Sequence, residues 1–90
     1  MGKSALVTGG AHRVGRAVAL ALARSGCDLM LHYFHSGEAA ADTAAEARAT
    51  GRRVATCAAD LGRMEGVQAL FAEVDRTFGG LDVLVNSAAL

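Results

Sequence analysis

The chain has 90 residues, of which 52% are hydrophobic and 20% charged, and its nine basic and nine acidic residues leave no net charge at pH 7. This balance fits one small globular domain and argues against a disordered chain or a nucleic-acid partner, because the latter needs a basic surface. No apolar run approaches the roughly 18 residues of a membrane span and no signal peptide is recognisable, so we expect a cytoplasmic protein without a membrane partner.

Strand and helix patterns alternate along the whole chain. The expected elements are a strand at 5–7, a helix at 13–25, a strand at 27–34, a helix at 38–50, a strand at 53–58, a helix at 64–78 and a strand at 81–85. Helices between strands imply crossovers, and right-handed crossovers imply a parallel sheet. The pattern therefore predicts an α/β fold with strand order 3-2-1-4.

Two helices carry apolar side chains at helical spacing, which should mark their buried faces. In the first helix these are Val14, Val18, Ala21 and Leu22. In the last helix they are Val67, Leu70, Phe71, Val74 and Phe78. Gly26, Gly51 and Gly79 stand where glycine commonly ends a helix.

Both cysteines lie inside apolar runs. Cys27 and Cys57 are predicted to be buried free thiols in strands, since free cysteine packs as a small hydrophobic residue. No Cys/His cluster has the spacing of a zinc site. His32, in the second strand, is expected to be packed and hydrogen-bonded, and His12 to be a tolerated loop residue that points to solvent.

The stretch 8–15, TGGAHRVG, follows the first strand and opens the first helix. Glycines allow a sharp turn and the close approach of a phosphate to backbone amides, and a helix N-terminus adds free N–H groups and a positive dipole end. In this strand–turn–helix context the run predicts nucleotide binding. It is not a mononucleotide P-loop, because no Gly-Lys-Ser/Thr closes it.

This stretch resembles the Thr-Gly-x-x-x-Gly-x-Gly signature of the short-chain dehydrogenase/reductase superfamily, with Arg13 in place of the middle glycine. Residues 31–36, LHYFHS, are similar to the His-Tyr-x-x-Ser run of its pteridine reductase-like, NADPH-dependent subgroup. Asp60 and Leu61 resemble the Asp-Leu pair that contacts the adenine. Residues 86–88, NSA, resemble the stretch that ends the fourth strand.

The resemblance implies the N-terminal half of a doubly wound, Rossmann-type fold, with residues 1–90 forming one NAD(P)-binding domain. Ser87 and Ala89 depart from the asparagine and glycine that are usual in the family, which leaves the hydrogen bonding there open. The implied cofactor contacts are Gly9, Arg13, Val14, Gly15, Tyr33, His35, Ser36, Asp60, Leu61, Asn86, Ser87 and Ala88.

The residues after the second strand favour NADP(H) over NAD(H). An NAD site usually has an acid about 20 residues after the last glycine, to hold the ribose 2′-hydroxyl. Here His35 and Ser36 stand there, Glu38 is expected to open the next helix, and Asp28 lies at the other end of the strand. Arg13, His35 and Ser36 could instead converge on a 2′-phosphate.

The resemblance also implies hydride transfer to a carbonyl, imine or related bond, with a Tyr-x-x-x-Lys pair for the proton. Tyr33 and Lys3 are the only tyrosine and lysine, and they lie too far apart in the sequence to form that pair. We therefore expect no catalytic residue in this chain, and a fold that continues beyond Leu90 in a complete member. Small-molecule substrate would bind only with that continuation, and a complete member would form a homo-oligomer.

Two alternatives remain open at this point. The chain could be a non-catalytic dinucleotide-binding module, or an inactive truncated product. The last strand, whose residues 83–85 are apolar on both faces, would lie at the edge of the sheet, where apolar strands promote aggregation. We therefore expect the 90-residue chain alone to be poorly stable, to self-associate or to need the missing half.

Overall fold

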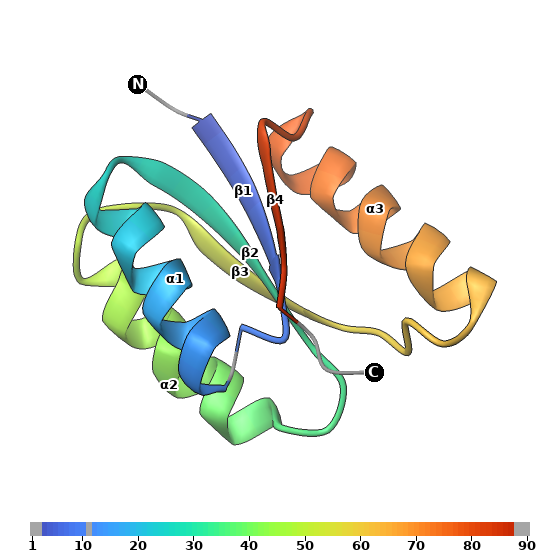
Figure 1. The fold of residues 1–90 in the computed structure, drawn as a ribbon. Helices are drawn as coiled ribbons and strands as arrows, with labels where there is room; N and C mark the ends of the chain where they lie inside the picture. The colour runs from blue at the N-terminus through green and yellow to red at the C-terminus, as the bar shows by residue number, and fades with distance from the viewer. Residues whose placement is uncertain (1–2, 11, 88–90) are drawn as a thin grey trace.

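The computed structural model describes residues 3–10 and 12–87. Strands and helices alternate, as the sequence predicts (Figure 1). The elements are β1 (Lys3–Thr8), α1 (Arg13–Arg24), β2 (Cys27–Tyr33), α2 (Gly37–Arg48), β3 (Val54–Ala58), α3 (Met64–Phe78) and β4 (Val83–Asn86). The expected boundaries hold to within a few residues. The largest shifts are of two residues: β1 begins at Lys3 instead of 5, α2 ends at Arg48 instead of 50, and β4 begins at Val83 instead of 81.

The strands form a parallel sheet in the order β3-β2-β1-β4, which confirms the predicted topology. Helices α1 and α2 cover one face of the sheet and α3 lies on the other (Figure 1). Because the strands are parallel, their carboxyl ends meet at one edge. That edge carries the turn after β1, the segments that follow β2 and β3, and Ser87 after β4.

The face under α1 and α2 holds the larger core. Alternate residues of β1 and β2 point to it, since side chains along a strand alternate between faces. They pack against small residues of the two helices, and an ion pair between Arg16 and Glu46 joins α1 to α2 at the surface. The buried cluster comprises Ala5, Val7, Ala19, Leu20, Ala23, Cys27, Leu29, Leu31, Ala44, Ala47 and Val54.

The predicted buried face of α1 is wrong by about one residue. Val14 is 69% exposed and Ala21 is also exposed, and Val18 and Leu22 are half-buried. The buried residues are Gly15, Ala19, Leu20 and Ala23. Three of these four residues are small, which lets the helix axis approach a sheet face already filled by leucines.

The face under α3 holds a smaller cluster of Leu6, Met30, Ala59, Leu70 and Val74. The predicted stripe of α3 is therefore right for its centre only. Val67 and Phe78 are half-buried, and Phe71 is 42% exposed. Within residues 3–10 and 12–87, α3 is the only helix on this face, so the outer part of the stripe has no described layer to pack against.

The two cysteines differ in burial. Cys27 is a buried free thiol, as predicted, but the free thiol of Cys57 is only half-buried. It lies in β3, which is an edge strand of the sheet that the described residues form. Across the described ranges, no helix is long and apolar enough to cross a membrane.

Candidate functional site

The glycine-rich turn after β1 is held tightly against its neighbours. Gly9 has a φ of 68°, a left-handed conformation that favours glycine. The Gly10 amide donates to the His32 carbonyl oxygen over 3.1 Å, and the His12 amide donates to the Gly9 carbonyl oxygen over 3.3 Å. These bonds fix the turn at the start of α1.

Gly15 is the point of closest approach between α1 and this turn. A Cβ at Gly15 would lie 2.3 Å from the Gly9 carbonyl oxygen and 2.7 Å from Ser87 Oγ. No side chain could occupy that space without displacing the backbone. The third glycine of the sequence motif therefore has the packing role that such a glycine has in a dinucleotide-binding turn.

The end of β4 is fastened to the end of β1 by Thr8. The Thr8 hydroxyl donates to Asn86 Oδ1 over 2.8 Å and accepts from the Ser87 amide over 3.1 Å, and Ser87 Oγ donates to the Thr8 carbonyl oxygen. Ser87 thus has defined partners although it departs from the family pattern. Ala88 and Ala89 lie outside the described residues.

The segment after β2 approaches the turn through an interaction that the sequence did not indicate. Ser36 Oγ lies 3.0 Å from His12 Nε2. His12 was interpreted as a loop residue that points to solvent. It is exposed, but it is bonded to the segment after β2. Such a contact joins two loops far apart in the sequence, and no local pattern reveals it.

The other predicted residues of this segment lie beside that contact. The ring centroids of Phe34 and His35 are 4.0 Å apart, and both residues are exposed. Tyr33 is half-buried, and its ring packs over Gly37 at the start of α2, where an added Cβ would lie 3.5 Å from it. Arg13 and Val14, in the first turn of α1, are exposed.

The segment after β3 contributes Asp60 and Leu61, both half-buried. Asp60 Oδ1 accepts from the Gly62 amide over 2.9 Å. The Asp60 carbonyl oxygen sits so close to α3 that a Cβ at Gly66 would lie 2.0 Å from it. Leu61 packs against the smaller core. All described residues of the predicted site thus belong to the carboxyl edge of the sheet or to the start of α1.

His32 links two parts of this edge. It is 4% exposed, and its ring lies between the Gly9 amide, 3.1 Å from Nδ1, and the Ala59 carbonyl oxygen, 2.8 Å from Nε2. The prediction that His32 is packed and hydrogen-bonded is confirmed. The identity of its partners could not be read from the sequence.

Charge at the start of α1 fits an anion. The first turn of α1 contains no acidic residue, whereas the first turns of α2 and α3 contain Glu38 and Glu65. Asp28 lies at the opposite edge of the sheet, where it bonds the backbone amide and side chain of Arg53 over 3.0 and 3.4 Å. No carboxylate therefore follows β2 before Glu38, which is exposed.

Lys3 and Tyr33 lie at opposite ends of parallel strands. Lys3 pairs with Cys27 at the amino edge, and Tyr33 pairs with Ala58 at the carboxyl edge. The two side chains therefore belong to opposite edges of the sheet.

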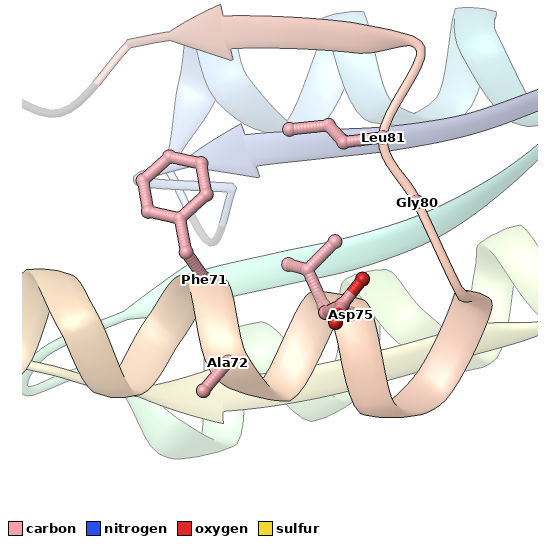
Figure 2. Close-up of a pocket in the computed structure, with 6 residues that line it drawn as sticks. Phe71, Ala72, Asp75, Gly80 and Leu81 are labelled. Carbon is pink, nitrogen blue, oxygen red and sulfur yellow. The ribbon is translucent and has the colours of Figure 1, made fainter.

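Two hollows lie on the α3 face of the sheet. One, of about 360 Å³, opens between α3 and the segment before β4, and Figure 2 shows Phe71 and Leu81 entering it from these two elements. The other, of about 220 Å³, lies beside the glycine turn, because Thr8 lines it together with apolar residues of α3 and with Leu61, Leu84 and Asn86. Their lining lacks the charged groups that would orient a polar ligand, apart from Asp75.

Two named reductases are similar to the chain over nearly all its length. It is 38% identical over 89 residues to the hydroxynaphthalene reductase of Aspergillus fumigatus, matching 99% of this chain and 33% of that protein. It is 40% identical over 90 residues to the 3-oxoacyl-[acyl-carrier-protein] reductase of Staphylococcus aureus, matching 100% of this chain and 37% of that protein. The chain thus spans about a third of the length of these relatives.

Solved structures agree. The acetoin dehydrogenase of Enterobacter cloacae matches with a TM-score of 0.93 and 37% identity, over 100% of this chain and 36% of that one. An NAD⁺-bound xylitol dehydrogenase matches with a TM-score of 0.93 and 33% identity, over 98% of this chain and 34% of that one. A Burkholderia cenocepacia dehydrogenase with bound NADP matches with a TM-score of 0.88 and 36% identity, over 93% of this chain and 33% of that one.

The fold and the glycine turn are those of a dinucleotide-binding α/β protein. The family model for short chain dehydrogenases matches residues 3–90. The chain belongs to the short-chain dehydrogenase family.

Proposed function

We propose that this chain is the cofactor-binding part of an NADP(H)-dependent short-chain reductase. The observation that carries the proposal is the joined edge of the sheet. The turn after β1, the start of α1 and the end of β4 meet so closely that Gly15 has no room for a Cβ. Backbone amides and an acid-free helix N-terminus face the space where a pyrophosphate would lie.

The described residues fit a dinucleotide along this edge. Gly9, Val14 and Gly15 would hold the pyrophosphate through backbone groups, and Asp60 and Leu61 would flank the adenine. The other residues proposed to contact the cofactor are Arg13, Tyr33, His35, Ser36, Asn86, Ser87 and Ala88. His12 is added because it contacts Ser36. Once bound, the cofactor would supply the hydride, and these residues would only bind and orient it.

NADP(H) is proposed over NAD(H) because of charge. Arg13 is exposed on the first turn of α1, and the segment after β2 presents His35 and Ser36 without a carboxylate. Arginine and hydroxyl groups bind a phosphate, whereas an acid would repel it. The solved relatives include one with NAD⁺ and one with NADP, so this chain's own residues must decide.

Titration of the 90-residue chain with NADPH and NADH tests this proposal. We expect tighter binding of NADPH. Arg13→Ala should weaken NADPH binding about 10-fold or more, the range of a charge-assisted hydrogen bond, and leave NADH unchanged. Arg24→Ala, on the last turn of α1, is the matched control and should change neither. Equal or tighter NADH binding, or an Arg13 variant with unchanged NADPH affinity, would contradict the proposal.

The proposed reaction is reduction of a carbonyl or C=N bond in a protein that extends beyond this chain. Both named relatives are reductases. A pteridine-type substrate, as in the pteridine reductase-like subgroup, rests on Arg13 and the run 31–36 alone. We further propose that the proton-transferring pair and the substrate site lie in the additional length, and that the complete protein is a cytoplasmic homo-oligomer.

A further inference from the structure

We propose that His32 is a positioning residue that holds the glycine turn in place for the dinucleotide. The inference rests on the proposed function, since it concerns binding of that cofactor. His32 lies in β2, between the turn that follows β1 and the segment that follows β3. Its side chain is the hydrogen-bonded link between those two segments.

The partners of the ring define its protonation state. Nδ1 accepts a hydrogen bond from the Gly9 amide over 3.1 Å, so this nitrogen carries no hydrogen. Nε2 lies 2.8 Å from the Ala59 carbonyl oxygen, which can only accept, so this nitrogen must carry the hydrogen. The ring is therefore the neutral Nε2–H tautomer, and its two sides have different tasks.

The backbone of the same residue reinforces the link. The His32 carbonyl oxygen accepts from the Gly10 amide over 3.1 Å. Side chain and backbone of one residue thus bind two successive amides of the turn. Because His32 is only 4% exposed, water has little access to its ring. A substitution that removes the Nδ1 acceptor would therefore leave the Gly9 amide without this hydrogen bond. Release of Gly9 would move the carbonyl oxygen against which Gly15 packs.

Two amide substitutions separate the two sides of the ring. His32→Asn places an oxygen at the same chain position as Nδ1, so it can still accept from Gly9 but cannot reach Ala59. His32→Gln places an amide nitrogen at the same position as Nε2, so it can still donate to Ala59 but cannot serve Gly9. Each variant loses one buried hydrogen bond, and a merely structural role would therefore affect both alike.

The test combines NADPH titration with thermal unfolding of the wild type and both variants. We expect similar losses of melting temperature, near-wild-type NADPH affinity for His32→Asn, and about 10-fold weaker binding for His32→Gln. Equal weakening in both variants, or weaker binding in His32→Asn alone, would overturn the proposal. A wild-type chain that binds no NADPH would instead overturn the proposed function.

Nitrogen-15 NMR of the wild-type ring gives a readout that needs neither cofactor nor variant. We expect hydrogen on Nε2 alone at neutral pH, and slow exchange of the Gly9 amide with solvent. Hydrogen on Nδ1, or a Gly9 amide that exchanges as fast as an open loop, would overturn the proposal whatever the NADPH titration shows.

Discussion

The two faces of the sheet differ in how completely their cores are closed. The face under α1 and α2 buries residues from three strands and two helices. The face under α3 buries a smaller set, and two hollows open along it. Leu29 and Leu84 show the contrast within one residue type, because Leu29 is fully buried and Leu84 is 53% exposed.

The proposed cofactor site and the α3 face differ in the same way. The residues of the site are held in place by other described residues, whereas part of the α3 face is uncovered. The glycine turn is fixed by contacts that Thr8, His32 and Gly15 make with other described residues. The α3 face has apolar side chains that nothing in the described chain covers. The relatives are about three times longer, and we propose that their additional length includes what packs on this face.

The largest expected effect is on the free energy of unfolding, and it is tested by comparing Leu29→Ala with Leu84→Ala. Leu29→Ala leaves a cavity in a closed core and should lower the free energy of unfolding by about 2–5 kcal/mol, enough to unfold a small domain. Leu84→Ala removes a half-exposed side chain and should cost about 1 kcal/mol or less. Urea denaturation measures both. Equal costs would show that the α3 face is as closed as the other.

The next test concerns association through β4, which pairs with β1 alone among the described strands. An apolar edge strand with a free side promotes pairing with a second copy. We expect sedimentation of the 90-residue chain to show association, and Leu84→Lys to shift it toward monomer. Met64→Lys, at an exposed position of α3, adds the same charge away from the strands and should change the association little. A wild-type monomer with a cooperative thermal transition would contradict this prediction.

A smaller effect on stability is expected from a substitution in the core under α1 and α2, and this substitution should stabilise the chain. Thr43 is fully buried in α2, and its hydroxyl oxygen has no hydrogen-bond partner among the residues that the structure describes. Thr43→Val replaces the hydroxyl with a methyl group of similar size and should stabilise the chain by about 1 kcal/mol.

Thr50→Val is the control for this change. The Thr50 hydroxyl donates to the Ala47 carbonyl oxygen over 2.7 Å, so its removal should not stabilise the chain. Thermal unfolding of both variants measures the difference. Destabilisation by Thr43→Val would show that the buried hydroxyl has a favourable role.

The sequence predicted the order of the strands better than the faces of the helices. Alternating strands and helices, with right-handed crossovers, leave few topologies, and the observed order is among them. Periodicity marked Val14 and Ala21 in α1 because valine and alanine form an apolar side. The sheet instead receives Gly15, Ala19 and Ala23, whose small size permits close packing. Hydrophobicity alone does not encode that preference.

Some features of the candidate site could likewise be predicted from the sequence, and others could not. The glycine turn could be read locally, because its residues are consecutive and their conformations are demanding. The contacts between His12 and Ser36, and between His32 and Ala59, join segments that are adjacent only after folding. Residue types at single positions do not reveal such pairs. The sequence therefore located the edge of the sheet, and the structure supplied the links across it.

The smallest expected effect concerns Cys57, at the rim of the α3 face. Burial, and then the nearby Glu73 carboxylate, raise the pKa of its thiol. Because the folded state favours the neutral thiol, its contribution to stability is complete below the unfolded pKa and is lost as pH rises through the folded pKa. At pH 8, alkylation of Cys57 should therefore be slower in the folded chain than in urea.

Mass spectrometry of the alkylated peptides distinguishes Cys57 from buried Cys27, which should react still more slowly when folded. Glu73→Gln removes the second cause of the raised pKa and should speed the reaction of Cys57 without changing that of Cys27. If Cys57 reacts as fast in the folded chain as in urea, this rim of the α3 face is open to solvent. The contrast between the two faces would then extend to the residues beside the smaller core.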